Sequence, residues 1–216
     1  ATALLAVCHL RRQQIEDAQP YVAEVIENEE VIKSAFQRRE FRRRAIDRFD
    51  EETVLSALRS GREACLDPDE LESEAGKLLQ TKTEDEILVD IGEMTPRGAV
   101  ELLLLIDRYA KNQLPVADRR LLPGPDEKTE RREIGKTVFS SFRRVLWRSL
   151  CDPESEVYKA WFAHGMGFVL SKKYIGAAVA ATLSGFGVGV RALAVSSTAL
   201  VLKMGIEVYC EHCRPE

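Results

Sequence analysis

Apolar residues along this chain recur at intervals of three and four, the period of an amphipathic α-helix. One such stripe consists of Ile134, Val138, Phe142 and Val145. Residues 99–106, AVELLLLI, are apolar on nearly every side apart from Glu101, which predicts a helix inside a core. Strand signals are sparse by comparison. The pattern therefore predicts an all-α protein, a multi-helix bundle of eight to ten helices.

Five segments carry residues that start helices. An Asp or Thr before a proline, or before a Glu three residues later, satisfies backbone N–H groups that the first turn leaves unpaired. These segments are Asp67-Pro68, Thr83 to Glu86, Thr95-Pro96, Asp152-Pro153 and Asp50 before two glutamates. The last one predicts a short helix that begins near residue 51 and ends at Gly61.

The clearest interruption of the helical pattern is the segment 114–127. It contains three prolines and one glycine, which do not fit a continuous helix. We expect a charged N-terminal helical region over 1–113, a loop or boundary over 114–127, and a C-terminal helical region over 128–216. The sequence leaves open whether these regions form one domain or two.

The most apolar part of the chain is the segment 172–210. It has no charge from Tyr174 to Val190, and a second uncharged run follows Arg191. Each run is shorter than the roughly 20 residues that span a bilayer, and joining them would put an arginine in lipid at a cost of at least about 2.5 kcal/mol. We therefore expect an apolar helical hairpin packed as core, with a membrane-active hairpin as the alternative.

Small residues within this segment recur every four positions. They are Ala177, Ala181, Gly185 and Gly189. On a helix they form one smooth helix-packing stripe, along which a neighbouring helix or a second copy of the chain could approach closely. The period-two alternation of residues 186–190 leaves a short strand open at its end.

Six arginines gather within eleven residues near the N-terminal end. They are Arg38, Arg39, Arg42, Arg43, Arg44 and Arg48. On a helix their guanidinium groups suit a partner or a phosphate of a nucleic acid, nucleotide or lipid headgroup, while Phe36, Phe41 and Ile46 would face inward. The competing interpretation is a solvated face paired with neighbouring acids such as Glu40 and Asp47.

The two cysteines of the segment YCEHCRPE, Cys210 and Cys213, would share one face of a helix. Zinc needs four ligands, and Cys8 with His9 could supply the other two only if the chain brings them together. A redox pair favours a helix N-terminus, whereas these thiols lie near a helix C-terminus. We favour structural thiols at a helix end over a metal or redox site.

Net charge, cysteine content and missing motifs restrict the classes of function that the chain could have. The net charge of −4 over 216 residues argues against a dedicated nucleic-acid binder. Five scattered cysteines do not resemble a secreted disulfide framework, which predicts a reducing, cytoplasmic setting. Phosphate-loop, serine-hydrolase and zinc-protease motifs are missing, and no cofactor is expected.

These observations favour a non-catalytic helical interaction or regulatory module that works within a protein complex. Its partner would be another protein or a second copy of the chain. Two alternatives stay open: a membrane-acting protein that uses residues 172–210, and a nucleic-acid-associated protein that uses the arginines of residues 38–48. The sequence names no small-molecule ligand.

Overall fold

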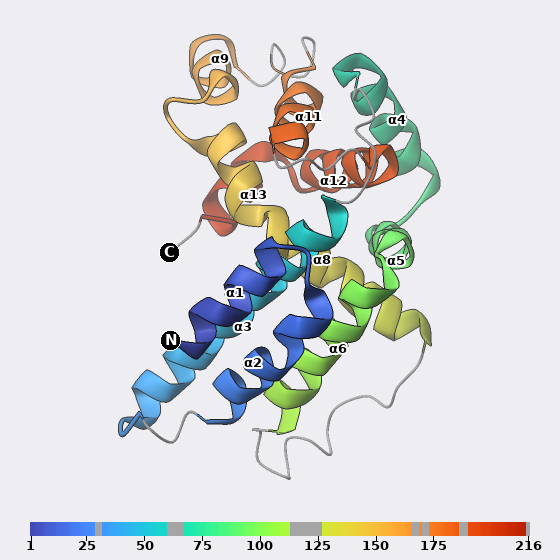
Figure 1. The fold of residues 1–216 in the computed structure, drawn as a ribbon. Coiled ribbons are helices and arrows are strands. Elements are labelled where there is room, and N and C mark those ends of the chain that lie inside the picture. Colours follow the sequence, from blue (N-terminus) through green and yellow to red (C-terminus); the bar gives the residue numbers. More distant parts are fainter. Residues whose placement is uncertain are drawn as a thin grey trace. The chain divides into compact units, whose positions relative to one another are not determined.

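The computed structural model describes residues 1–28, 32–59, 67–112, 127–165, 169, 173–185 and 190–214. These ranges contain eleven helices and no strand, which confirms the all-α prediction with one helix more than expected (Figure 1). Two compact units emerge from the packing. One comprises residues 1–57 and 95–130, and the other comprises residues 58–94 and 131–216. The boundary predicted at 114–127 stays a prediction, because almost all of it lies outside the described residues.

The first unit is built from four helices. They are α1 (Thr2–Arg11), α2 (Ile15–Glu27), α3 (Ala35–Leu58) and α6 (Arg97–Asn112). Helix α2 packs against both α1 and α6 (Figure 1). The core that they share buries Leu10, Val22, Ile26, Phe49, Leu102 and Ile106. Residues 99–106 thus line this core with one face, while Glu101 on the other face is exposed.

Helix α3 corrects one predicted boundary. Asp50 was expected to begin a short helix, but it lies in the interior of a single helix that runs from Ala35 to Leu58. Neither glycine nor proline occurs between these two ends, so nothing in the backbone interrupts the helix at residue 50. The arginine-rich segment and the buried residues 52–58 therefore belong to one element.

The second unit is built around α12. Its helices are α4 (Pro68–Thr81), α5 (Glu84–Met94), the greater part of α8 (Glu127–Cys151), α9 (Glu156–His164), α11 (Tyr174–Gly185), α12 (Arg191–Met204) and α13 (Ile206–His212). Helix α12 packs against α4, α5, α11 and α13. Every residue from Leu193 to Val201 is buried, so α12 forms the centre of this unit.

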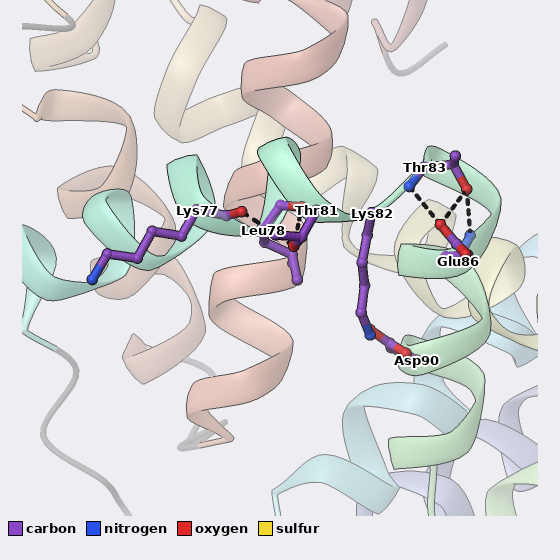
Figure 2. A network of polar contacts seen from close by, with 7 residues as sticks. All are labelled: Lys77, Leu78, Thr81, Lys82, Thr83, Glu86 and Asp90. Atoms are coloured by element: carbon purple, nitrogen blue, oxygen red, sulfur yellow. Dashed lines mark hydrogen bonds and ion pairs between the residues drawn. The ribbon is translucent and has the colours of Figure 1, made fainter.

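Two predicted helix starts are confirmed by their hydrogen bonds. A carboxylate oxygen of Asp67 accepts from the backbone N–H groups of Asp69 and Glu70 at 2.8 and 3.4 Å. At the start of α5, the Thr83 N–H donates to Glu86 Oε2 at 2.8 Å and the Glu86 N–H donates to Thr83 Oγ1 at 3.3 Å (Figure 2). This reciprocal pair is the predicted capping box.

The start predicted at Asp152-Pro153 is wrong by three residues. Helix α8 continues to Cys151, and Asp152 accepts from the Glu154 N–H at 2.9 Å within a turn. Ser155 caps α9 instead, because its hydroxyl oxygen accepts from the Tyr158 N–H at 3.1 Å. An aspartate side chain accepts from a backbone N–H two residues later in a turn just as it does at a helix cap, so the sequence alone does not distinguish the two.

Candidate functional site

The six predicted arginines all lie on α3, in the first unit. Arg39, Arg43 and Arg44 are exposed, whereas Arg38, Arg42 and Arg48 are half-buried. The helix therefore presents guanidinium groups chiefly to solvent or to a partner.

Acidic residues on the same helix pair with several of these arginines. Glu40 accepts from Arg43 at 3.0 Å and from Arg44 at 2.7 Å. Hydrogen bonds from Arg43 and then Arg44 hold the pKa of Glu40 below its ordinary value. Arg48 pairs with Glu52 at 2.5 Å and with Glu51 at 3.3 Å. This part of the helix matches the interpretation of a solvated face paired with neighbouring acids.

Two arginines differ from this pattern. Arg38 donates from Nη1 to the backbone oxygen of Ile32 at 2.9 Å, which ties the chain before α3 to its first turn. The Arg39 side chain is exposed and forms no hydrogen bond or ion pair with the described residues. Its guanidinium group is therefore available to a carboxylate or phosphate of a partner.

The phenylalanines of α3 contradict the expectation that they face inward. Phe36 is 71% exposed and Phe41 is 39% exposed. Phe49 points into the core, and Phe36 lies thirteen residues before it, about 220° around the helix axis at 100° per residue. Phe36 is thus nearly opposite the buried face. Phe41 is turned about 80° away and lies at its edge.

Exposure of the phenylalanines reveals a spacing that sequence reasoning missed. Phe36 is followed by Arg39 and Arg43, three and seven residues later. Phe41 is followed at the same two distances by Arg44 and Arg48. Residues at these spacings share one side of a helix, so each phenylalanine begins a stripe that continues as two arginines. Phe36 and Phe41 lie five residues apart, so at 100° per residue the two stripes begin about 140° apart around the helix axis and border the solvent-facing side of α3 from its two edges. We call this side of α3, with both stripes, the Phe–Arg face.

The buried part of α3 carries two carboxylates with different surroundings. Glu52 is 3% exposed and accepts from both Arg11 and Arg48. Asp50 is half-buried, and the pKa of its carboxyl group is raised to about 7, first by burial and then by Asp47 and Asp107. No sequence signal identifies Asp50 as a carboxyl group with a raised pKa, because its desolvation depends on how α3 packs.

The helix-packing stripe of α11 is largely exposed where the structure describes it, so its use by a second copy of the chain stays a prediction. Ala177 is half-buried, Ala181 and Gly185 are exposed, and Gly189 lies outside the described residues. A Cβ atom on Gly185 would meet no atom within 4 Å. The close approach of α11 to α4 occurs instead at Gly176, whose added Cβ would lie 2.8 Å from the Pro68 oxygen.

Surface contacts hold the apolar C-terminal segment to α4. Arg191, the charge that interrupts the segment, pairs with Glu74 and Glu70 at 2.7 Å each, and hydrogen bonds to Glu74 and then Glu70 raise the pKa of its guanidinium group. The Gly176 N–H donates to Glu72 at 3.0 Å, and burial raises the pKa of that carboxyl group. In the described ranges no single helix has the length and apolarity to cross a bilayer, although α12 and α13 together pass that test with a 94° bend between them.

The cysteines correct the expectation of structural thiols at residues 210 and 213. Cys210 forms a disulfide with Cys151 at the end of α8, with their Cα atoms 5.3 Å apart. Cys213 is buried at the C-cap of α13, and Cys8 is an exposed thiol on α1. His9 stacks on Tyr21 with ring centroids 5.3 Å apart. Among the described residues, no cluster of three or more His, Cys, Asp or Glu could hold a metal ion.

Comparison with known proteins adds no relative to this picture. No protein-family model matches the sequence, and no curated protein or solved structure is significantly similar to it.

Proposed function

We propose that this protein is a non-catalytic helical interaction module that binds an acidic segment of a partner protein through the Phe–Arg face of α3. The observation that carries the proposal is the exposure of Phe36 and Phe41 at the head of two arginine stripes. It rests on the 71% and 39% exposure of these side chains and on the guanidinium group of Arg39, which pairs with none of the residues that the structure describes.

The energetics of association favour such a face. Burial of a phenylalanine side chain stabilises a complex by about 1.5–3 kcal/mol relative to its exposure in water. Aromatic residues and arginine are also the types enriched in the core of protein interfaces. A carboxylate of the partner would accept two parallel hydrogen bonds from Arg39, which adds orientation as well as affinity.

The pairing of the remaining arginines favours a protein partner over a nucleic acid. Binding to phosphates gains free energy from the release of counterions by unpaired cations. Arg43, Arg44 and Arg48 already share their charge with acids on the same helix, and the whole chain carries a net charge of −4. A membrane-acting role for residues 172–210 has weaker support, because Leu193 to Val201 are buried.

The proposal is tested by replacement of both phenylalanines. Tagged wild-type protein and the variant F36A/F41A would be incubated with an extract of the native cells, and captured proteins quantified by mass spectrometry. Each captured protein would then be purified and titrated against both forms. We expect at least a tenfold weaker direct binding by F36A/F41A, which corresponds to about 1.4 kcal/mol or more.

Matched controls separate the Phe–Arg face from general stickiness. Phe162 on α9 is 83% exposed, so F162A removes an even more exposed phenylalanine from the other unit and should leave binding unchanged. R39E should weaken binding, whereas R12E makes the same charge change at an exposed arginine outside α3. Equal binding by wild type and F36A/F41A would refute the proposal. Binding of a 20-nucleotide RNA that depends on Arg39 would replace it by the nucleic-acid alternative. Binding of anionic vesicles that F36A/F41A retains would favour the membrane-acting alternative of residues 172–210.

A further inference from the structure

Three cysteines of the second unit lie at the junction of α8 and α13. Cys151 is the last residue of α8 and is bonded to Cys210 in α13. Cys213 follows one helical turn later, at the C-cap of α13, and it keeps its thiol. Cys151 and Cys213 are buried, and Cys210 is half-buried. The junction therefore holds one disulfide and one thiol within a shielded part of the unit.

A second disulfide is within reach of the same chain. Residues three apart on an α-helix have Cα atoms about 5 Å apart, from a rise of 1.5 Å per residue and a radius of about 2.3 Å. The observed Cys151–Cys210 pair has a Cα separation of 5.3 Å. Both separations fall inside the range of about 4.4–6.8 Å that disulfides adopt. Cys210 thus lies at bonding distance, by its backbone, from two alternative partners.

We propose that these three residues form a thiol–disulfide exchange site in which Cys213 competes with Cys151 for Cys210. The thiolate of Cys213 attacks the Sγ atom of Cys210, and a Cys210–Cys213 bond forms. The Cys151–Cys210 bond breaks, and Cys151 leaves as a thiolate that takes up the proton that Cys213 lost. One disulfide and one thiol are present before and after the step, so it needs no oxidant or reductant.

The fold determines which partner Cys210 has. In the folded unit, the Trp147 side chain on α8 donates from Nε1 to the backbone oxygen of Cys210 at 2.9 Å, which holds Cys210 beside the end of α8. When the packing of α13 on α8 loosens, only the disulfide itself keeps Cys151 near Cys210, whereas Cys213 stays attached to Cys210 through two residues of the chain. A partner close in sequence is favoured in an open chain, because closing a long loop costs more entropy. Local opening therefore converts the long-range cross-link into a local one.

This exchange would leave the unit with a different disulfide after α13 has opened. The Cys151–Cys210 bond ties α8 to α13 covalently, whereas the Cys210–Cys213 bond lies within a single turn. After exchange, no covalent bond joins α13 to α8, and of the two contacts described here only the Trp147 hydrogen bond can re-form. Cys151 then carries a thiol at the end of α8. Without the covalent link the open state should last longer, until Cys151 displaces Cys213 and the Cys151–Cys210 bond forms again.

Peptide mapping under non-reducing conditions tests the proposal. Trypsin places Cys151 in the peptide 149–159 and both other cysteines in the peptide 204–216. Full-length protein purified without reductant would be incubated in neutral buffer with increasing urea, then acidified, alkylated and digested. Without urea, we expect the two peptides linked to each other. At intermediate urea, we expect at least a fivefold rise in 204–216 with an internal disulfide, together with alkylated Cys151.

The variants C213S and C8S separate exchange from simple unfolding. C213S should retain the linked peptides throughout the urea series, since no neighbouring thiol can attack Cys210. C8S removes the exposed thiol of the other unit and should behave as wild type. The proposal is overturned if wild type keeps the linked peptides at every urea concentration, as C213S does. It is also overturned if the folded wild type contains no link between 149–159 and 204–216, and both outcomes are read from wild type whether or not C213S folds.

Discussion

The guanidinium group of Arg11 donates from Nε and Nη2 to one carboxylate oxygen of Glu52, at 3.0 and 2.9 Å. These residues lie 41 positions apart, at the end of α1 and in the buried half of α3. Arg48 contacts the same oxygen from the preceding turn of α3. One buried carboxylate therefore joins the two helices and also anchors an arginine of the Phe–Arg face.

The variant E52Q should destabilise the first unit. Glutamine keeps the shape of the side chain but removes the charge that Arg11 and Arg48 share. Loss of a partner from a buried ion pair costs several kcal/mol, but the Arg11 side chain is 55% exposed and water screens part of the effect. We expect the free energy of unfolding, measured in urea, to fall by about 1–2 kcal/mol. The more accessible pair partner Glu40, which is half-buried, is the control, and E52Q indistinguishable from E40Q would contradict this account.

Asp50 should make the stability of the first unit depend on pH. Burial raises the pKa of its carboxyl group from 3.8 to about 7, with Asp47 and Asp107 adding to the shift. Because the folded chain holds this proton more tightly than the unfolded chain, the contribution is fully present below about pH 4. It is lost as pH rises through 7. The full shift corresponds to about 4 kcal/mol, and partial contact with water should reduce it to about 2 kcal/mol.

The measurement compares wild type and D50N by urea unfolding between pH 5 and pH 8. Asparagine cannot ionise, so D50N should lack the fall in unfolding free energy that Asp50 causes. The two proteins should differ most at pH 8, where D50N should be the more stable. Parallel pH profiles for wild type and D50N would show that Asp50 titrates normally.

Local signals in the sequence predicted much of the fold. Asp67 and the pair Thr83 and Glu86 begin helices as expected, because a cap bonds to backbone groups two or three residues away. Asp50 and Asp152 carry the same side chain but failed as predictors. Whether an aspartate caps a helix, lies inside one or closes a turn depends on the backbone around it, which a single residue does not determine.

The candidate site depended on tertiary packing, which the sequence did not reveal. Periodicity placed the arginines on one helix, but the inward face of α3 is set by Phe49 and by the helices that cover it. Phe36 therefore appeared to be a core residue from its type alone. The disulfide between Cys151 and Cys210 spans 59 residues, and no local pattern indicates such a pairing.

Tight packing between α5 and α8 should make Gly135 intolerant of a side chain. A Cβ atom at Gly135 would overlap the backbone oxygen of Leu88, and one at Gly92 would overlap the backbone oxygen of Arg131. Backbone cannot move aside as a flexible side chain can, so we expect G135A to lower the free energy of unfolding by about 2–3 kcal/mol. In contrast, Gly76 on α4 has open space around its added Cβ, and G76A should stabilise by up to about 1 kcal/mol. Urea unfolding of both variants checks the contrast, and equal effects would disprove the close approach.

Reduction of the Cys151–Cys210 disulfide should weaken the second unit. A cross-link between residues 59 positions apart restricts the unfolded chain, and the entropy of closing such a loop corresponds to about 4 kcal/mol. The disulfide corrects the expectation that every cysteine is reduced, and it predicts that the stability of this unit depends on redox conditions. The cytoplasmic setting stays a prediction. We expect the free energy of unfolding, measured at about pH 5 where few thiolates are present to exchange the disulfide, to be about 2–4 kcal/mol lower for protein reduced beforehand with dithiothreitol than for protein with the disulfide.

The variant C151S separates the cross-link from other effects of the reductant. It should lower stability without dithiothreitol and should respond little when dithiothreitol is added, because its long-range disulfide is already missing. C8S, which changes an exposed thiol of the other unit, should retain the full response. Identical unfolding of wild type with and without dithiothreitol would mean that the bond between α8 and α13 does not restrict the unfolded chain. A response retained in C151S would place the stabilising disulfide elsewhere.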